Sequence, residues 1–254
     1  MSIKIENTQV IGWEAAIRGA RNPMNSWEKS DSLWFDGEEY HDICGNSGPA
    51  PKDLNGTGFD LGFSDHKLLM NLCKGGTEEA KWRRMIHVQM DVTAPLYWWK
   101  EFETYKVGTV SNSCSTMHKI QAKEFTLEDF SCEHLIDFED EEEPIMTLTQ
   151  PDFEESDFGL YSKTLLYITI DVLNHYRTKF LETKDKKYWW QMIQLLPSSY
   201  NQRRTIDLNY EVLAAQYRQR KDHKLQEWLD YCTFIKSLPY GEFITMEEKG
   251  ELNV

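Results

Sequence analysis

The chain has 254 residues and a mass of 30.0 kDa, which suits one large domain or two small ones and is long enough to bury a sizeable core. Asp and Glu total 42 against 28 Lys and Arg, and the resulting net charge of −14 disfavours a protein that wraps long nucleic acid, which needs a basic face. There is no run of 18 apolar residues, so no membrane span is predicted, and five scattered cysteines without a Cys-x-x-Cys spacing predict free thiols, no metal site and a cytoplasmic location.

The first third of the chain is rich in turn signals. A helix is expected over Trp13–Arg18 and should stop at Gly19. Asp36–Asp65 is rich in Gly, Asp, Asn and Pro, which predicts a long surface excursion. A second helix should follow, with Ser64 or Asp65 as its N-cap and Gly75 as its C-terminal stop.

The strongest strand signal comes next. Apolar and polar residues alternate over Ile86–Val92, which is the period of a half-buried strand. Thr93-Ala94-Pro95 should end the strand and start a helix over Leu96–Tyr105 that is rich in aromatic residues. Gly108–Thr116 is a run of small hydroxyl and amide residues, which predicts a loop that approaches a ligand closely.

The second half of the chain is mainly helical. Residues from about 137 to 163 contain two blocks of acids, which indicate a hydrated surface insertion because like charges repel one another. Helices are expected over Leu165–Phe180, over Tyr188–Leu196 and, as one or two segments, over Thr205–Lys236. Helices with a few strands predict the α+β class and one domain over residues 1–254.

One polar helix face carries the best candidate for chemistry. Asn209, Leu213, Gln216 and Arg220 are spaced four, three and four apart and should share that face. The guanidinium of Arg220 needs a partner, which is either a surface carboxylate or an anionic or carbonyl-bearing ligand. The sequence contains no phosphate-binding Gly-rich motif, no nucleophile elbow and no metal-ligand spacing of histidines.

Two blocks of the chain match a known family in the right order. After the strand and Ala94-Pro95, the family has Arg-His-Arg, seven residues and then Ser, and this chain has Thr104-Tyr105-Lys106, eight residues and then Ser115. Near the C-terminus the family's Leu-Pro, Asn-Ala-Arg, Leu-Arg and Ala-Gln segments align without gaps with six residues of this chain: Leu196-Pro197, Asn209, Leu213, Arg220 and Gln226. In these two blocks the chain resembles the flavin-dependent thymidylate synthases.

The resemblance implies a fold and a reaction. The expected fold is a helix-flanked, mainly antiparallel sheet in a homotetramer, with FAD bound between subunits. In that family methylenetetrahydrofolate supplies a carbon to C5 of dUMP, and reduced flavin, recharged by NADPH, supplies the hydride. No protein nucleophile is required.

The resemblance also implies site residues. Arg220 would be the catalytic residue, contacting N3 and the carbonyl region of the pyrimidine nucleotide and stabilising its ionised form. Ser115 would lie at the nucleotide, Glu101 would replace a substrate-binding Gln, and Arg203 is a cation available to the substrate. The flavin would be contacted by Thr104, Lys106 and Asn209.

The chain departs from the family at several charged positions. Where the family has Arg, this chain has Thr104, Met117 and Ile193, and the flavin-region motif Gly-His-x-Ser/Thr is replaced by Gly76-Thr77-Glu78-Glu79. Several charge-assisted contacts of roughly 1.5–3 kcal/mol each are therefore missing from the expected site. Two alternatives follow: a flavin-dependent C5 one-carbon transferase acting on another pyrimidine nucleotide, and a non-catalytic binding protein on the same scaffold.

Overall fold

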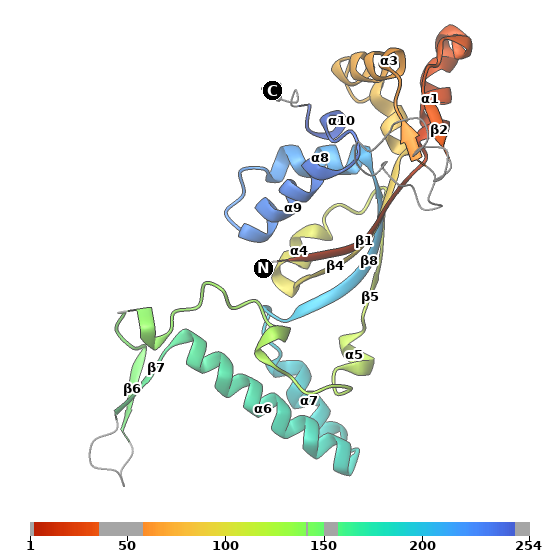
Figure 1. Ribbon diagram of the computed structural model, residues 1–254. Coiled ribbons are helices and arrows are strands. Elements are labelled where there is room, and N and C mark those ends of the chain that lie inside the picture. The colour runs from red at the N-terminus through yellow and green to blue at the C-terminus, as the bar shows by residue number, and fades with distance from the viewer. Residues whose placement is uncertain (1–2, 36–57, 141, 150–156, 247–254) are drawn as a thin grey trace. The chain divides into compact units, whose positions relative to one another are not determined.

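The computed structural model describes residues 3–35, 58–140, 142–149 and 157–246 (Figure 1). Its contacts divide the chain into two compact units. The large unit comprises Ile3–Val92, Phe102–Asn112 and Arg204–Val254, and the small unit comprises Met1–Ser2, Thr93–Glu101 and Ser113–Arg203. The expectation of one domain over the whole chain stays a prediction.

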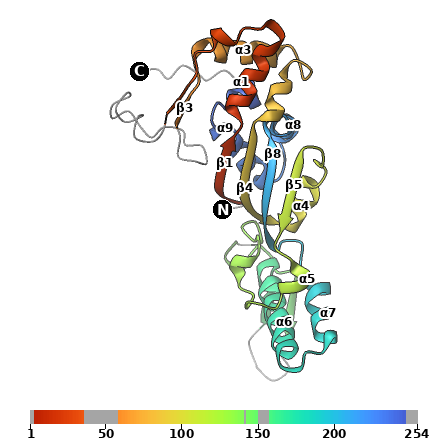
Figure 2. The ribbon, with the colours of Figure 1, turned by 90° about the vertical axis from the view of Figure 1, so that its right-hand side faces the viewer.

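A four-stranded antiparallel sheet is the central element of the fold, as expected for the α+β class. Its strands lie side by side in the order β1-β4-β8-β5 (Figure 2). Their bounds are Lys4–Ile11 for β1, His87–Pro95 for β4, Thr109–Ser113 for β5 and Asn201–Asn209 for β8.

The sequence predicted β4 correctly and missed two other strands of the sheet, β5 and β8. The buried residues of β4 alternate with partly exposed ones, and the strand continues through Pro95, so Thr93-Ala94-Pro95 forms its last residues rather than a helix cap. The predicted loop over Gly108–Thr116 is wrong, because Thr109–Ser113 is strand β5. Thr205–Asn209, expected to be helical, belongs to β8.

The large unit holds most of the helices. Helix α1 (Trp13–Arg21) runs through Gly19 instead of stopping there. Helix α3 (Phe63–Lys74) starts after Gly62 rather than at Ser64 or Asp65, and it ends at Gly75 as predicted. The remaining elements of this unit are η1 (Asn22–Met24), η2 (Trp27–Lys29), the paired strands β2 (Leu33–Phe35) and β3 (Gly58–Asp60), η3 (Ala80–Met85), α8 (Tyr210–Arg220), α9 (Gln226–Ser237) and α10 (Glu242–Thr245).

The start of α3 was mispredicted because Asp65 has a long-range role. Its buried carboxylate accepts hydrogen bonds from Arg21 Nε at 2.6 Å, Ser30 Oγ at 2.7 Å and Ser32 Oγ at 2.6 Å. These donors come from α1 and the segment after it, so no local pattern announces them. Most of the predicted excursion, residues 36–57, lies outside the described residues.

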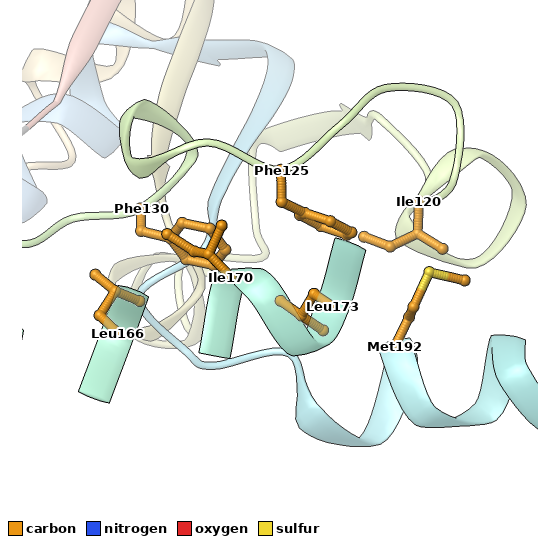
Figure 3. Close-up of a cluster of buried hydrophobic side chains, with 7 residues drawn as sticks. All are labelled: Ile120, Phe125, Phe130, Leu166, Ile170, Leu173 and Met192. Carbon is orange, nitrogen blue, oxygen red and sulfur yellow. The ribbon is translucent and has the colours of Figure 1, made fainter. Parts of the chain in front are cut away.

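The small unit is built on a helical hairpin. Helices α6 (Ser162–Thr183) and α7 (Lys186–Leu195) match the predicted helices within a few residues. One face of α6 and Met192 of α7 enclose an apolar cluster with residues from the preceding segments (Figure 3): Ile120, Phe125, Phe130, Leu166, Ile170 and Leu173. The other elements are α4 (Leu96–Phe102, shorter than predicted, its last residue in the large unit), α5 (Thr116–Lys119), η4 (Leu127–Asp129), η5 (Phe138–Asp140) and the antiparallel pair β6 (Met146–Thr149) and β7 (Asp157–Leu160).

No helix within the described ranges is long and apolar enough to cross a membrane.

Candidate functional site

Helix α8 places two of the predicted residues at its opposite ends. Asn209 is the N-cap of α8, and its buried side chain accepts a hydrogen bond from the Val212 backbone N–H at 3.1 Å. Arg220 is the last residue of the helix, about 16 Å further along the axis at 1.5 Å per residue. The two side chains therefore do not meet, although Leu213 and Gln216 are buried between them.

Arg220 lies in an aromatic cradle within the large unit. Its Nε donates to the Tyr105 hydroxyl at 3.0 Å, and one terminal nitrogen lies 3.0 Å from Nε2 of His223. The guanidinium carbon is 4.6 Å from the centre of the Trp228 ring, which is the geometry of a cation–π contact. The cradle restricts the half-buried cation to one orientation, which suits it to a fixed hydrogen-bond acceptor.

Residues of the segment from Thr104 to Gly108 lie against both ends of α8. Tyr105 contacts Arg220 at one end of the helix, and Thr104 and Lys106, which flank Tyr105 in the chain, are exposed. Gly108 has φ +77°, and a Cβ there would lie 3.1 Å from the amide nitrogen of Asn209. The segment that contains Thr104 and Lys106 thus lies beside the helix that Asn209 caps and Arg220 ends, through Tyr105 and Gly108.

The three predicted substrate residues belong to the small unit. Ser115 is exposed and caps the four-residue helix α5, accepting from the His118 backbone N–H at 3.1 Å. Arg203 is exposed on β8, and its carbonyl accepts from the Cys114 backbone N–H at 2.9 Å, which brings it beside Ser115. Glu101 is half-buried near the end of α4.

Two positions where the family has Arg now carry apolar side chains with different surroundings. Met117 in α5 is 49% exposed. Ile193 in α7 packs against the apolar cluster of the small unit. The position near 193 therefore contributes to packing here.

A cavity of about 240 Å³ in the large unit holds charged residues that the sequence analysis did not single out. It lies beside Gly76 and Thr77, at the place of the family's flavin-region motif, and one face of α8 forms a wall. That wall carries Glu211, Ala214, Ala215 and Arg218, with Lys221 one turn beyond; Arg83 of η3, Cys73 and residues of α10 complete the lining. The three-and-four spacing of these residues in the sequence is the signal that places them on one face of the helix.

The cavity is locally basic in an acidic protein. Arg83 is buried, and it contacts Glu211 at 2.6 Å and donates to the Phe243 carbonyl at 3.1 Å, while its Nε has no acceptor among the described residues. Arg83, Arg218 and Lys221 outnumber the single carboxylate of Glu211, so an anionic group is favoured there. Burial raises the pKa of the Cys73 thiol to about 11, so this thiol stays protonated and is a poor nucleophile.

Comparison with known proteins identifies the fold of the chain but finds no close relative in sequence. No protein-family model and no curated protein matches the sequence. Among solved structures, the flavin-dependent thymidylate synthase ThyX from Helicobacter pylori, complexed with FAD and dUMP, matches with a TM-score of 0.57 at 13% identity over 96% of both chains. A second structure of thymidylate synthase X from the same organism, with FAD and dUMP, gives a TM-score of 0.57 at 12% identity over 96% of this chain and 95% of that one. The chain therefore has a divergent form of the ThyX fold.

Proposed function

We propose that this protein is an FAD-dependent, thymidylate synthase-like methyltransferase that acts on dUMP as a homotetramer, with methylenetetrahydrofolate and NADPH as co-substrates. The observation that carries the proposal is the end-to-end match, over 96% of both chains, with a structure described as a complex with FAD and dUMP. The sequence resemblance, drawn from two separate blocks, points the same way.

The residues of the large-unit cavity fit part of FAD. Arg83, Arg218 and Lys221 present three cations to a space suited to a diphosphate, and Ala214 and Ala215 leave room beside it. FAD as a whole is larger than this cavity, so the remainder of the cofactor would contact other surfaces, among them Thr104, Lys106 and Asn209. When bound, FAD supplies the redox chemistry of the hydride step.

Arg220 would act on the pyrimidine. Deprotonation of the ring at N3 builds negative charge on the neighbouring carbonyl, and a preorganised guanidinium stabilises that charge without reorganising. The contacts with Tyr105, His223 and Trp228 keep the guanidinium in one orientation.

Ile193 favours a second candidate function. A side chain that packs against the apolar cluster stands where the family has an Arg, so the chain would either bind a different pyrimidine nucleotide or serve as a binding protein without turnover. Lys106, Lys119, Arg203 and Arg204 are the cations that would replace the missing contacts with a phosphate.

The proposal is tested by release of tritium from dUMP labelled at C5. Methyl transfer displaces the C5 hydrogen, so the FAD-loaded protein should release tritium only when methylenetetrahydrofolate and NADPH are both present. A yellow protein that releases label from another pyrimidine nucleotide but not from dUMP would support the first alternative. A yellow protein that binds nucleotides without any release would support the binding protein.

A further inference from the structure

Helix α1 forms one wall of a second cavity in the large unit, with a volume of about 260 Å³. The wall residues are spaced three, one and three apart and share one face of the helix: Glu14, Ile17, Arg18 and Arg21. Trp27 and Trp34 also line this space, which we call the indole cavity. It shares no described lining residue with the cavity proposed for FAD.

The two indole rings are exposed and yet held in place. Trp27 is 49% exposed, and its Nε1 donates to the side-chain oxygen of Asn22 at 2.7 Å. Trp34 is 40% exposed, and its ring centre lies 4.9 Å from that of Phe59, which in turn stacks on the buried ring of Trp13 at 5.3 Å. Exposed apolar surface is unfavourable in water, and a ring that is already fixed loses little entropy on binding. Both properties favour the stacking of a flat ligand.

A buried network supports the indole cavity from behind. Arg21 is 4% exposed; its Nε donates to Asp65 at 2.6 Å, and its terminal nitrogens donate to backbone carbonyls on either side of Trp27 at 3.2 and 2.8 Å. Ser30, which also lines the cavity, donates to the other oxygen of Asp65 at 2.7 Å. Because all three nitrogens of Arg21 already donate to protein acceptors and Asp65 balances its charge, this residue shapes the wall and leaves the polar recognition of a ligand to other residues.

The remaining polar groups of the cavity are a carboxylate and a guanidinium side by side. Glu14 and Arg18 lie one turn apart on α1, with 3.5 Å between Oε1 and Nη1, and their side chains are 72% and 63% exposed. An exposed pair of this kind contributes little to stability, so exchanging it for contacts with a ligand costs little. The pair suits a ring that presents hydrogen-bond donors next to acceptors.

We propose that the indole cavity binds a purine base, stacked on the indoles, and that guanine is the best match to Glu14 and Arg18. Guanine carries two adjacent donors, N1–H and the N2 amino group, for the two oxygens of the carboxylate, and two acceptors, O6 and N7, for the fork of the guanidinium. The volume of about 260 Å³ is just under the range of about 300–1,000 Å³ for sites that enclose a drug-sized ligand, so the base fits and the ribose and phosphate stay outside. This inference does not rest on the thymidylate synthase-like function.

The choice of base is tested by calorimetric titration of the full-length protein with guanosine monophosphate. Excess FAD and dUMP are present, so that any site for either of them is already filled. Guanosine monophosphate should bind at one site per chain, inosine monophosphate, which lacks the N2 amino group, about tenfold more weakly, and adenosine monophosphate more weakly still. Ribose 5-phosphate, which lacks the base, should not bind. Failure of the proposed function would abolish FAD and dUMP binding and leave this titration unchanged.

The indole cavity itself is tested by Trp27→Ala and Trp34→Ala, each of which should weaken guanosine monophosphate binding about tenfold or more, because a stacking surface is lost. Trp190→Ala is the matched control, since Trp190 lies in α7 and is also 49% exposed, and it should leave the affinity unchanged. Arg18→Gln, at an exposed position, should reduce the preference for guanosine over adenosine monophosphate about tenfold and leave the urea midpoint of unfolding unchanged.

Four results would each overturn the proposal. They are no binding of guanosine monophosphate to the wild type, equal binding of ribose 5-phosphate, a loss of affinity in Trp190→Ala as large as in Trp27→Ala, and an unchanged base preference in Arg18→Gln.

Discussion

The two units of the chain differ in what they bury. Among the described residues, the buried polar or charged side chains of the large unit are Arg21, Asp65, Arg83, Asn209, Gln216 and Glu227, whereas the small unit contributes Gln202. The cluster at the centre of the small unit is entirely apolar. Burying polar groups costs free energy unless they are paired, so the large unit maintains hydrogen-bond networks that packing alone does not require.

The residues proposed to bind ligands differ between the two units in the same way. The large unit has cations, Arg83 and Arg218, in the cavity beside the segment that replaces the family's flavin-region motif, and it holds Arg220 in an aromatic cradle. The small unit has apolar side chains at two positions where the family has Arg, and one of them, Ile193, packs α7 onto the apolar cluster. On the proposed function, the large unit carries cations that would bind an anion, whereas the small unit uses position 193 for packing.

The largest expected effect comes from breaking the buried network of the large unit. Asp65→Asn leaves the guanidinium of Arg21 buried without its charged partner, and removing one partner of a buried pair costs about 3–5 kcal/mol. The free energy of unfolding, measured in urea, should fall by about that amount. Asp60→Asn is the matched control, because Asp60 is exposed and its substitution should change the free energy by less than about 0.5 kcal/mol. Equal effects of the two substitutions would show that the network does not stabilise the fold.

The same carboxylate predicts a pH dependence. Burial alone would raise the pKa of Asp65, but the hydrogen bonds from Ser32 and Ser30 and the interaction with Arg21 outweigh it and hold the pKa below its usual value. Its contribution to stability is therefore complete above the unfolded-state pKa of about 3.9 and is lost as pH falls through the lower folded-state value. The stability difference between the wild type and Asp65→Asn should be constant from pH 7 to pH 5 and shrink below about pH 4. A difference that instead shrinks between pH 7 and pH 5 would contradict this sign.

A smaller but more specific effect is expected at Arg220. Arg220→Lys keeps the charge and loses the planar fork, so turnover should fall about 10²–10³-fold, as for loss of one well-aimed donor, while FAD stays bound. Stopped-flow oxidation of reduced flavin and calorimetric titration with dUMP measure the two parts of the effect. If Arg220 only pairs with a surface acid, its contribution is about 0–1 kcal/mol, and both measurements would remain at the wild-type values.

The cations of the cavity offer a test that spares the fold. Arg218→Gln combined with Lys221→Gln removes two exposed charges from the lining and should weaken FAD binding about 10–100-fold, equivalent to roughly 1.5–3 kcal/mol. Lys67→Gln with Lys74→Gln removes the same charge from exposed positions of α3 outside the lining and should leave FAD affinity unchanged. Equal losses in both double variants would mean that only the net charge of the protein matters.

The smallest expected effect is a gain in nucleotide affinity from a substitution in the small unit. Met117→Arg restores a cation at an exposed position, so stability should be unchanged and affinity for dUMP should rise about tenfold, equivalent to one charge-assisted hydrogen bond. The comparison nucleoside is deoxyuridine, which lacks the phosphate and should bind the variant and the wild type equally. A gain for deoxyuridine as large as the gain for dUMP would show that the new Arg does not contact the phosphate.

The sequence predicted the helices and strands that have one buried face. Strand β4 alternates and α6 repeats at helical spacing, so periodicity located both. Strand β5 was not predicted because four of its five residues are exposed, and Val110, its one apolar residue, is among the exposed ones. The start of α3 was misplaced because Asp65 serves Arg21, which lies 44 residues away, and the cavity was missed because Arg83 and Arg218 meet only after folding.

The most direct test of the account is whether the protein binds FAD. Wild-type protein is incubated with FAD, passed through a gel-filtration column and examined by absorbance, after which dUMP is added. We predict a yellow protein with one FAD per chain, whose flavin spectrum shifts when the nucleotide binds. A colourless protein that ignores added FAD would contradict the proposed function and would leave the ThyX fold here without its chemistry.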